Sequence, residues 1–272
     1  MKFENTEVWG FKHAIRGMRN PLESWNKSDS IILMEQDENK DFREVAKIGK
    51  KDLELMQKLI KAGSEHRKFL RQIFVSVDIT APAYFMAELD TYKIGTTRNS
   101  SSFQHKGTSK RFEIDDFEVD DKIKEVFWKI SSKLNPTDRL KIKDLYSKGF
   151  SQKQLSEMFN IGQAQVSVIV RDVNSTSENR ELFEHCWYWE QVLDALNSLR
   201  DKYLETKDYK YFRLIRQLLP QSYLYRSTIT MNYENILNMY RQRKNHKLTE
   251  WSKSFCDWVK TLPYAEELIC LE

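Results

Sequence analysis

The chain has 272 residues, of which 40% are hydrophobic and 12% are aromatic. This composition excludes a mainly disordered protein and allows one large domain or two modest ones. The net charge of +4 at pH 7 and the pI near 8.7 are compatible with binding nucleotides or nucleic acid but require neither.

The cysteines and the hydropathy of the chain indicate which cellular compartment to expect. The three cysteines, Cys186, Cys256 and Cys270, lie far apart and show neither metal-ligand spacing nor a disulfide framework. Such usage fits a reducing compartment, so we expect a cytoplasmic protein without a bound metal. We see no secretory signal and no apolar run of about 18 residues, so no membrane span is expected.

The N-terminal part of the chain predicts a helix at its end and leaves one basic region with two readings. Basic and aromatic side chains alternate over residues 1–30, which fits a solvated helix face beside core aromatics or, alternatively, a phosphate-binding loop. Leucine, methionine and isoleucine at helical spacing predict a helix over residues 50–61, with Gly63 as its stop. His66 follows and is read either as a structural histidine or as a ligand.

A strand and a helix then lead into a polar stretch. Residues 73–79 (IFVSVDI) alternate like a half-buried strand, which Ala81-Pro82 is expected to break. Residues 83–89 (AYFMAEL) restart as a helix. Hydroxyls, amides and cations crowd residues 88–106, and Gly95 permits a tight turn. Such a stretch is suited to an anionic ligand, although a polar surface loop has the same composition.

Residues 116–178 have a character of their own. A helix is predicted over 122–134, and residues 137–173 predict three short helices at about 138–147, 151–158 and 163–170. A turn at 160–162 separates the last two, as in a helix-turn-helix. The expected core is Leu155, Phe159, Ile161, Val166 and Ile169.

This helical triple has side chains suited to DNA. The tip of its third helix carries Gln163, Gln165 and Ser167, whose amides and hydroxyl match base edges. Lys153 and Arg171 are suited to phosphates. Small helical triples also serve as packing or protein-contact modules, and both readings stay open.

The last third of the chain is predicted to be helical throughout, over residues 180–272. A polar linker at 174–179 precedes it, so the triple looks inserted into another domain. Pro220 ends or kinks one helix. Asn232, Asn235 and Asn238 recur at i, i+3 and i+6 as on one helix, and a basic cluster follows them: Arg241, Arg243, Lys244, His246 and Lys247.

The order of these pieces resembles the flavin-dependent thymidylate synthase family. That family has a glycine-histidine step, a strand, an Ala-Pro start to the next helix and an Arg-His-Arg loop. His66 and Ala81-Pro82 match the step and the helix start. The loop matches as follows: Thr91, Tyr92 and Lys93 stand for Arg-His-Arg, Asn99 and Ser102 match with one residue inserted, and Gln104 replaces a nucleotide-binding arginine.

The C-terminal part resembles the same family over residues 213–247. Arg216 and Arg243 take the places of nucleotide-binding arginines. Asn232 and Asn238 match flavin-contacting asparagines, and His246 or Lys247 lies near the flavin-side histidine. Glu234 stands where the family has an arginine.

The resemblance implies an enzyme that methylates dUMP to dTMP. Methylenetetrahydrofolate supplies the carbon, reduced FAD the hydride, and NADPH reduces the flavin. It implies catalytic roles for Arg216, Arg243 and Ser102, and it adds Ser101 and Gln104 to the substrate site. The implied cofactor residues are His66, Thr91, Tyr92, Lys93, Asn99, Asn232, Asn238 and His246.

The fold implied is α+β, with a mixed sheet and long helices interrupted by a small all-α helix-turn-helix insertion. We expect the synthase-like halves at residues 1–115 and 179–272, the insertion at 116–178, and a homotetramer. Two other functions stay open. One is a related pyrimidine-modifying enzyme such as a hydroxymethylase, and the other is a DNA-binding regulator on an inactive synthase scaffold.

Overall fold

The structure is a computed structural model that describes residues 1–36, 42–130, 136–171 and 177–271. The chain forms two compact units, and each is described by itself. Unit 1 comprises Met1–Ser101 and Leu224–Glu272, and unit 2 comprises Ser102–Tyr223. The division expected from the sequence, with an insertion over residues 116–178, stays a prediction.

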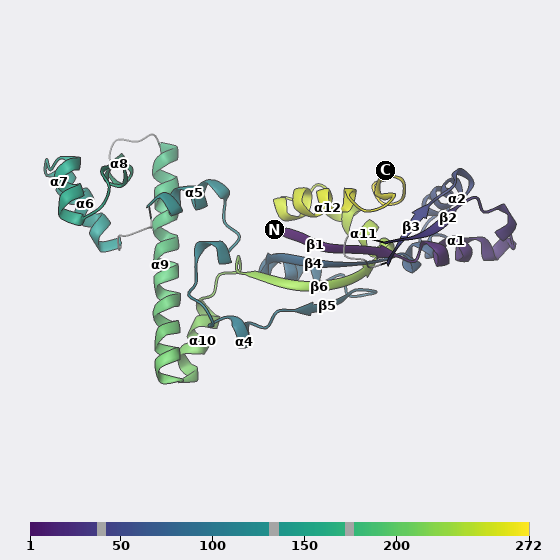
Figure 1. The fold of residues 1–272 in the computed structure, drawn as a ribbon, viewed down its shortest axis with the longest axis horizontal. Coiled ribbons are helices and arrows are strands. Elements are labelled where there is room, and N and C mark those ends of the chain that lie inside the picture. Colours follow the sequence, from purple (N-terminus) through teal and green to yellow (C-terminus); the bar gives the residue numbers. More distant parts are fainter. Residues whose placement is uncertain (37–41, 131–135, 172–176, 272) are drawn as a thin grey trace. The chain divides into compact units, whose positions relative to one another are not determined.

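Unit 1 is built on a four-stranded sheet with the order β1–β4–β6–β5 (Figure 1). The strands are β1 (Lys2–Trp9), β4 (Phe74–Pro82), β6 (Leu224–Asn232) and β5 (Thr97–Ser100). A separate hairpin pairs β2 (Ile31–Gln36) with β3 (Phe42–Lys47). Every described ladder is antiparallel, so the prediction of a mixed sheet is wrong.

The strand predicted over residues 73–79 is confirmed as β4. Its side chains alternate, with Val75, Val77, Ile79 and Ala81 fully buried. The ladder continues to Pro82 rather than breaking at Ala81, because Pro82 is its last residue and needs no further N–H bond. Helix α3 (Ala83–Leu89) begins immediately afterwards, as predicted.

The prediction that residues 180–272 are helical throughout is wrong, because Leu224–Asn232 forms β6. This strand pairs with β4 over nine residues, from Phe74 opposite Asn232 to Pro82 opposite Leu224. Alternate side chains Ser227, Ile229 and Met231 are buried, as period-two packing requires. Asn232 therefore precedes the helix instead of lying on it.

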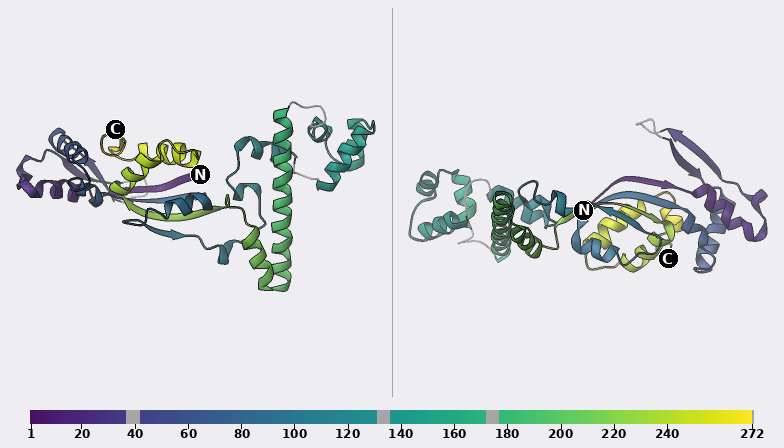
Figure 2. Two further views of the ribbon diagram at one scale, coloured as in Figure 1. Left: turned by 180° about the vertical axis from the view of Figure 1, so that it is seen from behind. Right: turned by 90° about the horizontal axis from the view of Figure 1, so that it is seen from below.

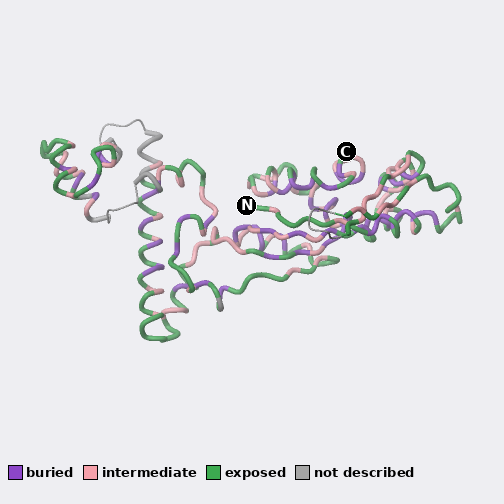
Figure 3. Tube along the Cα trace, viewed as in Figure 1, coloured by how far each residue is buried: buried purple, intermediate pink, exposed green. Residues whose placement is uncertain are grey.

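Helices cover one face of this sheet (Figures 1 and 2). The helical segments of unit 1 are α1 (Phe11–Arg19), η1 (Asn20–Leu22), η2 (Trp25–Lys27), α2 (Lys50–Lys61), η3 (Lys68–Gln72), α3, α11 (Tyr233–Arg243), the π-helical η5 (Glu250–Phe255), α12 (Cys256–Lys260) and α13 (Ala265–Leu268). Trp258 of α12 stacks on Phe3 of β1 at 4.9 Å between ring centroids. Figure 3 shows burial concentrated on β4 and α11, whereas the edge strands β1 and β5 are exposed.

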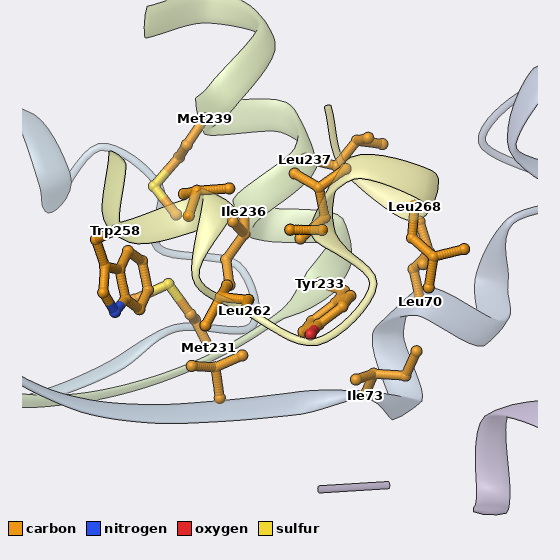
Figure 4. Close-up of a cluster of buried hydrophobic side chains, with 14 of the residues drawn as sticks. Leu70, Ile73, Met231, Tyr233, Ile236, Leu237, Met239, Trp258, Leu262 and Leu268 are labelled. Atoms are coloured by element: carbon orange, nitrogen blue, oxygen red, sulfur yellow. The ribbon is translucent and has the colours of Figure 1, made fainter. Parts of the chain in front are cut away.

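The core of unit 1 gathers around α11 (Figure 4). Ile236 and Leu237 of this helix are fully buried together with Leu268 of the C-terminal segment. The fully buried Tyr233 donates its hydroxyl hydrogen to the carbonyl of Pro263 at 2.7 Å. Its polar atom is therefore satisfied inside an apolar cluster.

Unit 2 is largely helical. Its elements are α4 (Phe103–Lys106), η4 (Ile114–Asp116), α5 (Asp121–Ile130), α6 (Pro136–Ser147), α7 (Gln152–Phe159), α8 (Gln163–Arg171), α9 (Ser177–Thr206) and α10 (Tyr209–Leu218). The three predicted short helices correspond to α6, α7 and α8. The predicted linker over 174–179 is wrong in its last three residues, which belong to α9, while 174–176 lie outside the described residues. Helix α10 ends just before Pro220, as predicted.

A buried carboxylate fixes α2 to the preceding turn in unit 1. Asp52 is fully buried and accepts a hydrogen bond from Arg19 Nε at 2.6 Å. The hydroxyls of Ser28 and Ser30 donate to its other oxygen at 2.7 Å each. Burial alone would raise the pKa of Asp52, but these hydrogen bonds outweigh it and the pKa is lowered.

We expect Asp52→Ala to lower the free energy of unfolding by about 3–5 kcal/mol, because it leaves the guanidinium of Arg19 buried and unpaired. Glu54→Ala on the same helix is the control, since Glu54 is exposed and, among the described residues, pairs only with Lys50 at 3.9 Å. The control should cost less than about 1 kcal/mol. Urea denaturation measures both, and equal losses would contradict this role of Asp52.

Candidate functional site

The loop after α3 is folded by short-range hydrogen bonds. The hydroxyl of Thr91 donates to the carbonyl of Glu88 at 2.7 Å, and the N–H of Tyr92 donates to Leu89 at 3.0 Å. These bonds close the last turn of the helix. Tyr92 is half-buried as a result, while Lys93 remains exposed.

Tyr92 contacts Arg243 at the end of α11. Arg243 Nε donates to the Tyr92 hydroxyl at 3.0 Å, and that hydroxyl donates to Gln242 at 2.8 Å. Arg243 Nη1 forms an ion pair with Glu88 at 2.8 Å. Nη2 has no hydrogen-bond partner in the described part of the chain. The guanidinium is therefore oriented through two nitrogens and offers the donors of the third.

Aromatic packing holds the same guanidinium from another side. Its carbon lies 4.9 Å from the ring centroid of the fully buried Trp251, within cation–π range. Trp251 packs in turn on Phe85 of α3 at 4.2 Å. The side chain of Arg243 is only 18% exposed, so its charge has been partly removed from water and interacts more strongly with an anion.

His246 lies beside this cluster. Its Nδ1 accepts a hydrogen bond from the N–H of Leu248 at 3.2 Å, so the neutral imidazole carries its proton on Nε2. Nε2 lies 3.9 Å from the carboxylate of Glu88. His246, Tyr92 and Arg243 are all residues predicted from the sequence; Arg243 and His246 lie beside Glu88, and Tyr92 contacts Arg243.

A pocket of about 260 Å³ opens next to this loop. Its lining residues are Leu89, Asp90, Tyr92, Lys93, Thr96 and Arg98. Arg98 pairs with Asp90 at 2.6 Å, whereas Lys93 has no ion pair among the described residues. The hydroxyl oxygen of Thr96 is buried and has no hydrogen-bond partner in the part of the chain described. An unpaired cation and an unpaired hydroxyl together fit an anionic ligand, which would satisfy both.

Asn232 and Asn235 hold the loop from the other side. Asn232 caps α11 by accepting from the Asn235 N–H at 3.0 Å, and Asn235 donates to the carbonyl of Ile94 at 2.6 Å. Gly95 has φ +77, and a Cβ there would lie 2.8 Å from the side-chain nitrogen of Asn232. Asn232, predicted to contact a flavin, therefore has a structural role in capping the helix and packing on the loop.

A second ion-pair cluster joins α11 to the segment before β4. Arg67 donates to Glu234 at 3.2 Å and to Asn238 at 3.1 Å, and Arg71 pairs with Glu234 as well. Burial raises the pKa of Glu234, but the hydrogen bonds from Arg71 and Arg67 outweigh it and lower that pKa. Asn238 is thus engaged inside the protein. Arg67 and Arg71 were missed, although Glu234 at an arginine position of the family hinted at a cationic partner.

The other predicted residues of unit 1 are exposed. His66 lies before η3, Asn99 lies on β5 opposite Thr228, and the N–H of Ser101 donates to the carbonyl of Arg226 at 2.8 Å. Their predicted roles in binding stay predictions.

Ser102, Gln104 and Arg216 belong to unit 2. Ser102 is the N-cap residue of α4 without a side-chain cap bond, and Gln104 is exposed on that helix. Phe103 lies between Ser102 and Gln104 in the sequence, and the Arg216 guanidinium lies 4.8 Å from the centroid of its ring. Arg216 on α10 therefore lies next to the Ser102–Gln104 segment, and the predicted roles of these residues at a substrate site stay predictions.

The predicted DNA-contacting residues lie on α7 and α8. Lys153 and Gln163 are exposed, and Gln165 and Ser167 are half-buried. The side chain of Arg171 lies outside the described residues. Within the described ranges, no three His, Cys, Asp or Glu side chains are grouped to hold a metal, and no helix combines the length and apolarity needed to cross a membrane.

Comparison with solved structures identifies the fold. The chain aligns over its full length with flavin-dependent thymidylate synthase ThyX of Helicobacter pylori complexed with FAD and dUMP, covering 100% of both chains at TM-score 0.56 and 16% identity. A second ThyX structure with FAD and dUMP aligns at TM-score 0.55 and 16% identity, covering 99% of this chain and 97% of that one.

A UMP/dUMP methylase, PolB of Streptomyces cacaoi bound with 5-Br dUMP, aligns at TM-score 0.50 and 12% identity, covering 99% of this chain and 93% of that one. Neither a protein-family model nor a curated protein matches the chain significantly. At these identities the similarity is one of fold, and the chain has the α+β fold of ThyX.

We expect Gly95→Ala to destabilise the protein more than Gly63→Ala. Both glycines have positive φ, so each alanine costs about 1–2 kcal/mol in backbone strain. A Cβ at Gly63 meets nothing within 4 Å, whereas one at Gly95 displaces the cap at Asn232, for about 1 kcal/mol more. Urea denaturation compares the variants, and a Gly63→Ala loss as large as that of Gly95→Ala would refute the packing role.

Proposed function

We propose that this protein is an FAD- and methylenetetrahydrofolate-dependent enzyme that methylates dUMP to dTMP, with NADPH as reductant. The observation that carries the proposal is the guanidinium of Arg243, which Tyr92 and Glu88 orient and whose Nη2 has no partner among the residues described. It occurs in a chain with the fold of proteins solved with FAD and dUMP.

Arg243 suits recognition of a pyrimidine. A guanidinium can donate two hydrogen bonds to the carbonyl oxygens of a pyrimidine. Its positive charge also stabilises the anionic form of the base, which must develop before a carbon of the ring can be methylated. The ion pair with Glu88 and the ring of Trp251 restrict the guanidinium to one orientation before substrate arrives. The negative charge of Glu88 also partly neutralises the guanidinium, so Arg243 interacts with Glu88 and the substrate together.

Arg216 is proposed as a second nucleotide contact. It is exposed, it stacks on Phe103, and its guanidinium suits bidentate binding of a phosphate. Ser102 and Gln104 flank Phe103 and supply a hydroxyl and an amide for further hydrogen bonds. Gln104 replaces a family arginine, so this site carries one positive charge less.

We propose that the pocket beside Tyr92 receives one part of the cofactor. Lys93 and the unpaired hydroxyl of Thr96 are proposed to hold an anionic part of FAD, and Tyr92 supplies an aromatic wall. Reduced FAD supplies the hydride when it is bound. Asn232 and Asn238 contribute indirectly, because their side chains fix α11 and the loop.

Several finer expectations remain part of the proposal. Cofactor contacts by His66, Thr91, Asn99 and His246, a substrate contact by Ser101, and a homotetramer rest on the family resemblance. The hydroxymethylase alternative would use the same arginines, and its product would distinguish it.

We expect Arg216→Ala to weaken dUMP binding to the FAD-loaded protein by about 2–3 kcal/mol, the scale of lost hydrogen bonds to a charged group. This corresponds to about a 30- to 150-fold rise in Kd. Arg213→Ala is the matched control, since Arg213 is also exposed on α10, three residues earlier. It should leave Kd unchanged.

Calorimetric titration with dUMP measures both constants. An unchanged Kd for Arg216→Ala, with the fold intact by circular dichroism, would remove Arg216 from the nucleotide site. A similar weakening in Arg213→Ala would reduce the effect to surface charge and count equally against the assignment.

A further inference from the structure

Helices α6, α7 and α8 of unit 2 have the connections of a helix-turn-helix. Three residues join α7 to α8, and the first, Asn160, adopts φ 50, a left-handed conformation that asparagine tolerates. The third, Gly162, donates its N–H to the side-chain oxygen of Gln165 at 3.1 Å. At the other end of α7, Ser151 and Gln154 form a reciprocal capping box. Both ends of the turn are therefore specified by side chains.

These helices have a core of their own. Its buried members are Ile142, Leu155, Ile161, Val166, Ile169 and Val170. The predicted core residue Phe159 is only partly buried, and the other four predicted members are confirmed. Helix α8 contributes Val166, Ile169 and Val170 to this core and also contacts α5, whereas Gln163 and Ala164 at its N-terminal end are exposed.

The other face of α8 has the chemistry of a base reader. Gln163 and Ala164 are exposed at its N-terminal end, and Ser167 follows one turn later. A glutamine amide pairs with adenine in the major groove, and an alanine methyl packs on the methyl group of thymine. No acidic residue occurs on α8, so nothing on the helix repels a phosphate backbone. Gln165, also predicted to read bases, is engaged with Gly162 instead.

Exposed lysines lie on and just before the first turn of α7. Lys153 is exposed on the first turn of α7 and has no ion pair among the described residues. Lys148 is exposed before α7 and pairs with Asp144 at 2.6 Å. Over residues 136–171 the chain has six lysines and arginines against three aspartates and glutamates. In helix-turn-helix proteins the first helix of the pair crosses the backbone while the second enters the groove.

We propose that α8 binds in the major groove of double-stranded DNA, with Gln163 contacting a base edge and Lys153 contacting a phosphate. This inference is independent of the proposed dUMP chemistry, since none of its residues belongs to the nucleotide or cofactor site. Three observations support it. The core of the triple is formed without Gln163 and Ala164, the exposed end of α8 is polar and uncharged, and Lys153 on α7 has no ion pair among the described residues.

The test uses the full chain and a fluorescein-labelled duplex of random sequence, about 30 base pairs or three helical turns long. Anisotropy is measured over a series of salt concentrations. We expect binding that weakens with salt, and Lys153→Ala should weaken it and lower the slope of log K against log salt by about 1. Lys51→Ala is the charge-matched control, because Lys51 is exposed on α2 in unit 1. It should change neither value.

A second arm tests base reading. Duplexes selected from the random pool by the unaltered protein should bind Gln163→Ala about 5- to 150-fold more weakly, while unselected duplexes bind it equally well. Absence of salt-dependent binding near physiological ionic strength would overturn the proposal. So would equal binding by Lys153→Ala, or binding confined to single-stranded DNA or RNA of the same length. Circular dichroism of each variant confirms that the helices are intact.

Discussion

The pairing of β4 with β6 is the constraint on which the rest of unit 1 depends. It joins Phe74–Pro82 to Leu224–Asn232 over nine antiparallel pairs, although all of unit 2 lies between them in the sequence. The apolar sides of both strands are buried in one core, so a register slip of one residue would expose them. Closing so long a loop costs entropy, and burial across these two strands must exceed that cost.

This pairing also positions the candidate site. β4 ends at Pro82, where α3 begins; this helix carries Glu88, and the loop after it carries Tyr92. β6 ends at Asn232, where α11 begins and carries Arg243. The ion pair between Glu88 and Arg243 is thus a consequence of two adjacent strands that each lead into a helix. The buried Trp251 packs on Phe85 of α3 and lies against the same guanidinium.

Local sequence signals predicted the elements that are defined locally. Helix α2, strand β4, and the triple α6–α8 follow from periodicity, from Gly63 and from the cap at Ser151. Strand β6 was missed because its signal, alternation around Ile229, is short and lies between helices, and its partner is distant in sequence. Strand β1 was missed for a different reason, since it is an edge strand with mostly exposed side chains and a left-handed residue at Asn5.

The sequence predicted several residues of the candidate site but not the contacts between them. The family resemblance named Tyr92, Arg243 and His246, but no local pattern shows that Tyr92 contacts Arg243 or that Arg243 and His246 both lie beside Glu88. Asn232 and Asn238 illustrate the reverse case, because the same amide that binds a ligand in one protein caps a helix or pairs with Arg67 here. The unpaired hydroxyl of Thr96 emerged only from the packing of the folded loop.

The central claim is that this chain uses its synthase fold to convert a pyrimidine nucleotide with a flavin and a folate. The most direct measurement is mass-spectrometric analysis of the products formed from dUMP with FAD, methylenetetrahydrofolate and NADPH, using carbon-labelled folate. The account predicts dTMP that carries the labelled methyl group. A hydroxymethylated nucleotide would contradict the proposed reaction, and unchanged dUMP with folded, FAD-loaded protein would contradict the claim of an enzyme.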